Sequence, residues 1–430
     1  MINIVDKRQC CGCTACVQKC PKHCIFLYED GEGFLYPKID INNCIDCGLC
    51  EKVCPFQDCD KSLLPLEVWA VKNRNEPDRM HSSSGGVFIA LAREVLALDG
   101  VVFGAVFDEN YEVKMAYSET LEGVRPMMGS KYLQARMETA YVDAERFLKQ
   151  GRHVLFSGAP CQIAGLHKYL RKDYPNLLSV DFLCHGVPSP GVWRRYLKET
   201  MNDLQSARRA VAGKNTVFPS LNVMPTIAGI EFRDKTLHGW KKYSFVVRGS
   251  SAFKADKNSV LLSDIHRENP FMRGFLSDIY LRPSCYECKC KNGVSHSDLT
   301  IADFWGIDRL IPDFDDDKGV GLVLVNTTSG HHFFDKLSME KRLSSLADVQ
   351  PLNGGFKEYT RPHPKRVQFF QRLAKGESVK NIVEDLLHVP LWRRILRAIK
   401  ELCRRIFQRK LTCDSVSYTH LRAHETELHL

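Results

Sequence analysis

The chain has 430 residues, of which 44% are hydrophobic, 10% aromatic and 26% charged, and its formal net charge is +9. This composition is typical of soluble globular proteins and excludes a disordered chain, and the length is enough for two or three domains with cores of their own. No run of 18 apolar residues occurs, so we expect no membrane-spanning helix, and the first residues do not read as a signal peptide.

Eighteen cysteines are present, in a chain that we expect to be cytoplasmic. Disulfides are rare in that compartment, so metal ligation is the better interpretation. Two groups of four lie near the N-terminus, each with the spacing C-x2-C-x2-C-x3-C followed by proline: Cys10, Cys13, Cys16 and Cys20 before Pro21, and Cys44, Cys47, Cys50 and Cys54 before Pro55. This spacing is typical of bacterial ferredoxins that bind two 4Fe–4S clusters.

The fourth cysteine of each group in such ferredoxins ligates the cluster of the other group. We therefore expect one cluster on Cys10, Cys13, Cys16 and Cys54, and a second on Cys44, Cys47, Cys50 and Cys20. Two zinc sites are the alternative, but zinc ligands usually come as paired C-x2-C units separated by a longer loop. Three cysteines fall outside the pattern, and we expect them to pack as small apolar side chains: Cys11, Cys24 and Cys59.

Beyond a linker at residues 60–66, short apolar runs alternate with helical patterns. We expect strands at 68–71, 101–107, 113–117, 153–156, 178–183 and 320–325. We expect helices at 87–98 and 138–150, a third that begins after Cys161 and ends at Leu170, and a fourth that begins near Gly330. Residues 205–262 show only isolated apolar pairs that indicate short strands, and after residue 360 the pattern becomes helical and basic. This order predicts the fold class α/β (mixed α+β).

The stretch Ser82–Gly86 opens the helix expected at 87–98. Its two glycines permit close approach of the backbone, its hydroxyls donate hydrogen bonds, and a helix N-terminus favours negative charge. A phosphate-binding loop is therefore one interpretation, and a serine N-cap with flexible glycines is the other. The usual nucleotide-binding patterns, G-x-x-x-x-G-K-[ST] and G-x-G-x-x-G, are absent.

Further cysteines are dispersed over the larger part of the chain. Cys161 and Cys184 each follow an expected strand, and ligands of open α/β sheets bind at that edge. Cys285 and Cys288 form a C-x2-C pair with Cys290 nearby. Four thiols that meet at one sheet edge could hold a third cluster, whereas separate buried cysteines are the alternative. His185, next to Cys184, is a candidate proton donor or a structural histidine.

Five stretches of the sequence resemble the landmarks of one known family: 82–86 (SSSGG), 158–166 (GAPCQIAGL), 184–190 (CHGVPSP), 285–288 (CYEC) and 297–306 (SDLTIADFWG). That family is the beta subunit of the deazaflavin (coenzyme F-420) hydrogenase and dehydrogenase. The chain is similar to its bacterial members with a fused N-terminal ferredoxin, and the resemblance covers roughly residues 1–330. Genes for such bacterial members often accompany polysaccharide pyruvyl transferases in surface-polysaccharide clusters.

The resemblance implies an iron–sulfur flavoprotein that binds FAD and passes electrons between clusters and a deazaflavin or another acceptor. It implies that the third cluster is held by Cys161, Cys184, Cys285 and Cys288. It also implies flavin contacts from Ser83, Ser84, Gly85, Gly86 and Lys131, although an ordinary surface lysine is the alternative for Lys131. The substrate varies across the family, so the resemblance does not identify a deazaflavin as the substrate.

The basic excess of the chain is concentrated near its C-terminus. Residues 391–410 carry eight basic residues and one acidic residue, with apolar residues at helical spacing. Such a helix suits contact with an anionic membrane surface or an acidic partner, and packing on its own domain is the alternative. No nucleic-acid-binding module accompanies the charge, so we expect no nucleic-acid partner. Residues 411–430 resemble translated sequencing-adapter DNA, and we expect them to be a non-native tail.

The expected organisation is a two-cluster ferredoxin domain (1–60), two parts of the beta-subunit domain (66–150 and 151–330), a helical basic tail (331–410) and the non-native tail (411–430). We expect the ferredoxin domain to exchange single electrons with a redox partner protein, either a ferredoxin or an oxidoreductase subunit. FAD would then pass the electrons to a two-electron acceptor. The alternatives are a non-catalytic electron-transfer subunit of a larger redox complex in polysaccharide biosynthesis, and a structural zinc protein. The expected location is cytoplasmic, with possible contact to the inner membrane face through residues 391–410.

Overall fold

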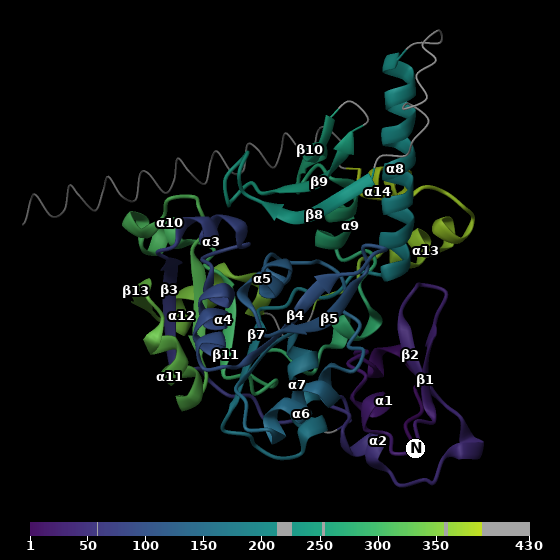
Figure 1. The fold of residues 1–430 in the computed structure, drawn as a ribbon. Helices are drawn as coiled ribbons and strands as arrows, with labels where there is room; N and C mark the ends of the chain where they lie inside the picture. The colour runs from purple at the N-terminus through teal and green to yellow at the C-terminus, as the bar shows by residue number, and fades with distance from the viewer. Residues whose placement is uncertain (58, 213–225, 252–253, 357–359, 389–430) are drawn as a thin grey trace, which may run out of the picture. The chain divides into compact units, whose positions relative to one another are not determined.

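The computed structural model describes residues 1–57, 59–212, 226–251, 254–356 and 360–388 (Figure 1). The chain forms two compact units, Met1–Ile382 and Val383–Leu430, and the second is described only as far as residue 388. The basic helix expected at 391–410 and the tail at 411–430 lie outside the described residues. No helix in the described parts of the chain has the length and apolar character needed to cross a membrane.

The first unit begins with a small module built around cysteine-bearing loops, drawn in purple in Figure 1. Its elements are α1 (Ala15–Lys19), β1 (Ile25–Glu29), β2 (Leu35–Ile39) and α2 (Leu49–Lys52). Strands β1 and β2 pair antiparallel. Gly12 and Gly48 have φ angles of +73° and +69°, a left-handed conformation that glycine adopts without a steric penalty. Each cysteine loop can therefore turn back sharply on itself.

A mixed sheet of eight strands forms the centre of the larger domain, with the order β13-β3-β12-β11-β7-β6-β4-β5. The strands are β3 (Glu67–Asn73), β4 (Val101–Phe107), β5 (Val113–Ser118), β6 (Val154–Ser157), β7 (Leu177–Phe182), β11 (Leu299–Asp303), β12 (Gly321–Val325) and β13 (Met339–Ser344). The neighbours β4, β6, β7 and β11 run parallel, and the outer strands are antiparallel. The predicted mixed α/β class is confirmed.

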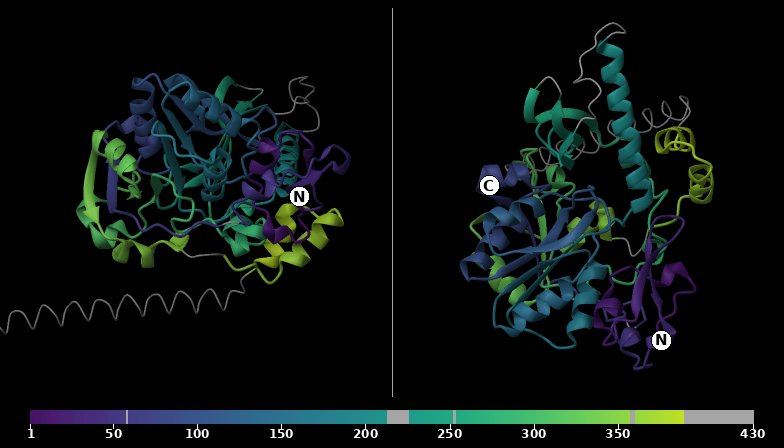
Figure 2. Two further views of the ribbon diagram at one scale, coloured as in Figure 1. Left: turned by 90° about the horizontal axis from the view of Figure 1, so that it is seen from below. Right: turned by 45° about the vertical axis from the view of Figure 1, so that its right-hand side comes forward.

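Helices cover both faces of this sheet (Figure 2). The helices of this part are α3 (Glu76–His81), α4 (Val87–Ala97), α5 (Leu121–Val124), α6 (Ala140–Lys149), α7 (Pro160–Leu170), α10 (Ile307–Leu310), α11 (Thr328–Lys336) and α12 (Leu346–Val349). Because side chains alternate along a strand, Val102 joins the core beneath α4 and α11, whereas Val101 and Phe103 join the core beneath α6 and α7. That second core is continuous with the cysteines of the N-terminal module.

A separate three-stranded antiparallel sheet lies beside a long helix at the top of Figure 1. Its elements are α8 (Pro190–Ala212), β8 (Thr226–Asp234), β9 (Ser244–Ser251), β10 (Lys254–Ile265) and α9 (Pro270–Leu276), and α13 (Arg366–Ala374) and α14 (Val379–Leu386) follow later in the chain. Its core is aromatic: Trp193 packs on Phe232 and Phe271, with ring centroids 5.3 and 5.0 Å apart. The isolated apolar pairs expected to form short strands lie in β8 and β9.

The sequence prediction missed two strands of the main sheet. Strand β11 was not expected, although its residues belong to the stretch 297–306, and β13 lies beyond the boundary placed at residue 330. Strand β13 pairs with β3 at the sheet edge, so the residues from 331 to 344 belong to the sheet domain and not to a helical tail. Charged residues such as Glu340, Lys341 and Arg342 interrupt the apolar pattern by which β13 could be predicted from the sequence. Such residues are expected in an edge strand exposed to water.

Candidate functional site

The second predicted cysteine quartet lines one small cavity in the N-terminal module. Its wall includes Cys20, Cys44, Cys47 and Cys50, as the crossover rule requires. Cys24 also lies on this wall, with its Sγ 3.4 Å from the Cys20 Sγ. Cys20 directly follows α1, Cys44 and Cys47 lie in the loop before α2, and Cys50 lies in α2. This donor set fits a 4Fe–4S cluster, and Cys24 packs directly beside it.

The first predicted quartet lies on the side of the module that faces the larger domain. Burial raises the pKa of the Cys16 thiol, and the neighbouring Cys10 and Cys54 thiols raise it further. Gly165 of α7 approaches so closely that a Cβ there would lie 3.1 Å from the Cys13 Sγ. Cys13 thus lies next to α7, and Cys10 and Cys54 lie near Cys16. Because burial disfavours a free thiolate here, bound iron is the partner that would hold these sulfurs deprotonated.

The dispersed cysteines approach one another at the C-terminal edge of the parallel strands. Cys161 follows β6 in the first turn of α7, and Cys184 follows β7. Burial raises the pKa of the Cys285 thiol to about 12, and the nearby Cys184 and Cys288 add to this rise. The Cys288 thiol also raises the pKa of the Cys161 thiol. The structure therefore brings the four predicted ligands of a third cluster to one region.

Two further thiols in this region were not predicted as site residues. Cys11 is buried between Cys13 and Cys161, within hydrogen-bonding reach of both. Cys290 is fully buried, and its thiol also raises the pKa of the Cys161 thiol. Nothing in their sequence spacing marks either residue, because the contact arises only when the N-terminal module packs on α7. Among the described residues, no three or more His, Cys, Asp or Glu side chains lie close enough together to hold a single metal ion.

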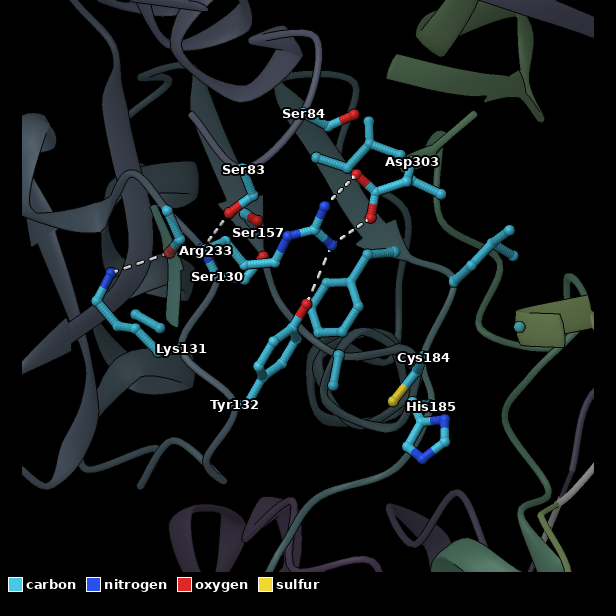
Figure 3. A pocket seen from close by; sticks show the side chains of 18 of the residues that line it. Ser83, Ser84, Ser130, Lys131, Tyr132, Ser157, Cys184, His185, Arg233 and Asp303 are labelled. Atoms are coloured by element: carbon cyan, nitrogen blue, oxygen red, sulfur yellow. Dashed lines mark hydrogen bonds and ion pairs between the residues drawn. The ribbon is translucent and has the colours of Figure 1, made fainter. Parts of the chain in front are cut away.

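A cavity of about 1150 Å³ opens at the same sheet edge (Figure 3). Its wall carries every predicted flavin contact and two of the dispersed cysteines: Ser83, Ser84, Gly85, Gly86, Lys131, Cys161 and Cys184. In the view of Figure 3, Cys184 and His185 lie on the opposite side from Lys131. The volume is slightly above the range of about 300–1,000 Å³ for small-molecule sites, which leaves room for a dinucleotide.

The serine–glycine loop is held by the sheet as much as by any ligand. A Cβ at Gly85 would lie 2.4 Å from the backbone N of Gly321 and 2.5 Å from the carbonyl O of Val71. Glycine is therefore required at this position for packing against β3 and β12, and not only for ligand approach. The Ser84 hydroxyl donates to the carbonyl O of Val320 at 2.8 Å, whereas the Ser83 Oγ accepts from the Ser130 backbone N–H at 2.6 Å. The Ser83 hydroxyl proton is left to donate to a ligand.

Lys131 is a cationic group on the wall of the same cavity. Its Nζ donates to the carbonyl oxygens of Met128 at 3.1 Å and Gly129 at 3.3 Å. Burial lowers the pKa of Lys131 to about 7. Its ammonium form is therefore only partly populated near neutral pH, and an anionic ligand beside it would restore the charge.

A buried ion pair on the cavity wall was missed by the sequence prediction. Arg233 of β8 donates to both carboxylate oxygens of Asp303 at the end of β11, at 2.5 and 2.9 Å, and to the Tyr132 hydroxyl at 3.2 Å (Figure 3). The Asp303 carboxylate also accepts from the Trp240 indole N–H at 2.7 Å. Asp303 stands in one of the stretches that resemble the family, but its partner lies in a region where the sequence indicated only short strands and no site residue. This pair joins the two sheets beside the cavity.

The predicted proton-donor candidate has a carboxylate partner. The His185 Nε2 lies 2.7 Å from the Asp278 Oδ1, and both residues line the cavity. The His185 ring also packs edge-on against Phe275, with centroids 5.0 Å apart. The imidazole is thus fixed in orientation beside Cys184, which suits either of the two roles considered for it.

Comparison with known proteins identifies the two parts of the chain. A family model for the C terminus of the coenzyme F420 hydrogenase/dehydrogenase beta subunit matches residues 151–349, and a model of a 4Fe-4S dicluster domain matches residues 9–57. Residues 151–349 therefore form a C-terminal domain of the coenzyme F420 hydrogenase/dehydrogenase beta subunit type, and residues 9–57 form a 4Fe-4S dicluster domain. Like the members that the sequence resembles, the chain carries an N-terminal domain for two 4Fe–4S clusters, and the zinc alternative is set aside.

The curated relatives match short stretches of this chain. It is 28% identical over 99 residues to one subunit of the H2:CoB-CoM heterodisulfide,ferredoxin reductase of Methanothermobacter marburgensis, which is 20% of this chain and 13% of that protein. It is 51% identical over 42 residues to a 7Fe ferredoxin of Hydrogenibacillus schlegelii, which is 10% of this chain and 47% of the ferredoxin. The chain thus spans less than half the length of either relative.

A solved structure of the F420-reducing [NiFe] hydrogenase complex from Methanosarcina barkeri is also similar to this chain. The similarity covers 76% of this chain and 94% of that one, with 15% sequence identity and a TM-score of 0.43.

Proposed function

We propose that this chain is an iron–sulfur flavoprotein oxidoreductase that passes electrons between a ferredoxin-type partner and a two-electron acceptor. One observation carries the proposal. The cavity of about 1150 Å³ has the loop at Ser83–Gly86 and Lys131 on its wall together with Cys161 and Cys184. A cofactor in this cavity would therefore lie against the thiols proposed to hold the third cluster.

The proposed ligands of the third cluster are Cys161, Cys184, Cys285 and Cys288. Soft thiolates are the usual protein ligands of iron–sulfur clusters, and these four come from the ends of two parallel strands and one C-x2-C pair. The buried Lys291 supports this assignment, because its charge favours the thiolate forms of Cys184 and Cys288. Electrons would reach these sulfurs from the first quartet across the contact of Cys11 with Cys161.

The proposed flavin site uses three features of the cavity wall. The Ser83 hydroxyl and the N-terminus of the 11-residue helix α4 suit a phosphate, and the Lys131 ammonium suits its negative charge. When bound, FAD can take up electrons singly and deliver a hydride, which a cluster cannot do. The acceptor is not specified by these residues, and a deazaflavin is one member of the class.

A count of cofactors in anaerobically purified protein tests this proposal. Three 4Fe–4S clusters require about twelve irons per chain, and two require about eight. Acid extraction should release about one FAD per chain, since the flavin is proposed to be held without a covalent bond. Protein with about eight irons would remove the third cluster from the proposal, and full iron without flavin would remove the flavoprotein assignment.

The second candidate function is a subunit that transfers electrons without a substrate site of its own. The Methanothermobacter relative is one subunit of a larger reductase, which favours this candidate. Purified protein that holds three clusters and FAD but reduces none of a panel of two-electron acceptors, deazaflavins included, would favour it further. Turnover with any acceptor by the isolated chain would exclude it.

The location that we propose is cytoplasmic, with peripheral membrane contact through residues 391–410. Eight basic residues on a helical pattern would be attracted to anionic lipid by about 1 kcal/mol each. Removal of the chain from residue 391 onward should therefore release it from vesicles that contain anionic lipid. Equal vesicle binding by the full and shortened chains at low salt would contradict this part of the proposal.

A further inference from the structure

Arg282 is a buried cation at the contact between the N-terminal module and the larger domain. Its side chain is among the largest fully buried ones, with 1% of the residue exposed. Its backbone lies three residues before Cys285, whose N–H donates to the Arg282 carbonyl O at 2.9 Å. Its guanidinium reaches away from Cys285 into the first cysteine loop. One residue thus contacts the segment of the third quartet and the segment of the first.

The guanidinium makes four hydrogen bonds in this contact. The Nε donates to the Cys10 carbonyl O at 2.9 Å, and the Nη1 donates to the Gln134 Oε1 at 3.0 Å. The Nη2 donates to the Leu35 carbonyl O at 2.8 Å and lies 3.7 Å from the Cys10 Sγ. The Cys10 sulfur therefore receives an N–H from a charged donor, the stronger class of hydrogen bond.

Gly12 makes room for this side chain. A Cβ at Gly12 would lie 2.9 Å from the Arg282 Cζ and 2.7 Å from the Gln134 Nε2. The small residue in the first cysteine loop is thus explained by the approach of Arg282 and Gln134, in addition to its left-handed backbone conformation. Gln134 in turn donates to the Cys11 carbonyl O at 2.7 Å. The loop that carries Cys10 is therefore held by the larger domain in a fixed geometry.

The charge of Arg282 has no carboxylate partner among the described residues. The groups that act on it are the Cys10, Cys11 and Cys285 thiols and the Tyr36 phenol. The Tyr36 ring lies below the guanidinium, 4.4 Å from the Cζ to the centroid. A buried charge without a counter-charge is strongly destabilising, so a negative group must face it in the working protein. A cluster bound by four thiolates supplies that negative charge.

We propose that Arg282 is a positioning residue that raises the reduction potential of the cluster held by Cys10, Cys13, Cys16 and Cys54. The inference rests on the proposed function for its ligand assignment. Reduction adds one electron from the donor to this cluster, with no bond formed or broken, so the cluster becomes more negative by one charge. The buried guanidinium stabilises that added charge through the Cys10 sulfur. It thereby makes this cluster an easier electron acceptor.

Lys291 offers a matched comparison on the other side of the contact. It is also buried, at 6% exposure, and its Nζ lies 3.5 Å from the His185 carbonyl O. Its charge lowers the pKa of the Cys184 and Cys288 thiols, which belong to the proposed third cluster. Arg282 also lowers the pKa of the Cys285 thiol, but it is the one of the two that donates to a sulfur of the first quartet. The variants of Arg282 should therefore shift the first-quartet transition most, and those of Lys291 the transition of the third cluster.

The test is a redox titration of the full chain, reconstituted anaerobically and followed by electron paramagnetic resonance. Arg282→Gln should lower the reduction equilibrium constant of one cluster about tenfold, which is about 59 mV for a one-electron couple. Arg282→Lys should keep the charge, lose part of the hydrogen bonding, and show a smaller shift in the same direction. Lys291→Gln should shift a different transition and leave this one within about twofold of the parent.

The iron content decides how a negative result is understood. Parent protein with fewer than about eight irons would contradict the ligand assignment of the proposed function, and the role of Arg282 with it. If the parent is fully loaded, the potentials decide. An unchanged or raised potential in whichever Arg282 variant keeps its N-terminal iron would overturn the role of Arg282 and leave the proposed function intact.

Discussion

The N-terminal module and the eight-stranded domain differ in what fills their cores. About half of the buried hydrophobic side chains of the module are thiols, including Cys13, Cys16, Cys20 and Cys50, and its regular elements have at most five residues. The larger domain buries aliphatic and aromatic side chains between the sheet and helices such as α4 and α7. We infer that the module depends on its metal for its fold, whereas the larger domain needs its cofactors only for function.

Removal of iron should have the largest effect and separate the two regions. Chelation under oxidising conditions takes away the groups that neutralise and join the buried thiolates, so the module should unfold locally. Amide hydrogen exchange in residues 1–57 should accelerate by about a hundredfold or more, because protection there reflects a closed local fold. Exchange in β4, β6 and β7 should remain slow. Equal acceleration in both regions would mean that the larger domain also depends on iron for its fold.

The buried ion pair gives the opposite test, in which the larger domain is damaged and the module is spared. Asp303→Asn leaves the Arg233 guanidinium buried without its counter-charge, and such a loss costs about 3–5 kcal/mol of stability. Denaturant unfolding followed by tryptophan fluorescence should report this change, with N-terminal iron unaltered. The control is Glu76→Gln, which removes an exposed pair with Lys318 and should leave the midpoint unchanged. A neutral result for Asp303→Asn would show that water reaches the pair.

The sequence predicted the region with contiguous ligands better than the region with dispersed ones. The cysteine quartets needed only spacing, because loops of two or three residues bring their sulfurs together locally. Most of the buried strands were predicted because they are apolar runs, as in Val101–Phe107 and Gly321–Val325, but the central strand β11 was missed. Strand β13 was missed because its exposed, charged pattern lacks that signal. The partners Arg233 and Arg282 could not be found, since both act across contacts between distant segments.

A smaller effect is expected from the pH dependence of anion binding in the cavity of the larger domain. Burial lowers the pKa of Lys131 to about 7 from 10.5, and a bound phosphate should raise it again. The contribution of Lys131 to affinity is then fully present below about pH 7 and is lost as the pH rises through the pKa of the bound form. Lys131→Met should weaken FAD binding about tenfold at about pH 6 and much less at about pH 9.

Fluorescence titration of flavin-free protein with FAD, at several pH values, would measure this dependence. Ser83→Ala is a useful companion variant, because it removes a neutral donor from the same wall and should weaken binding equally at each pH. If the FAD affinities of the parent and Lys131→Met change in parallel with pH, Lys131 does not contact the bound anion.

Electron flow from the N-terminal module to the larger domain is the decisive measurement. Cys161→Ser should remove or weaken the third cluster, because serine is a poor substitute for a soft thiolate. Stopped-flow spectra would follow the N-terminal clusters and the flavin after mixing with a strong one-electron reductant, with Cys59→Ser, which replaces an exposed cysteine outside all three quartets, as the control. We expect the N-terminal clusters to be reduced at the parent rate in both variants, and flavin reduction to slow at least about tenfold in Cys161→Ser alone. Flavin reduction at the parent rate in Cys161→Ser would contradict the proposed path of electrons through the third cluster.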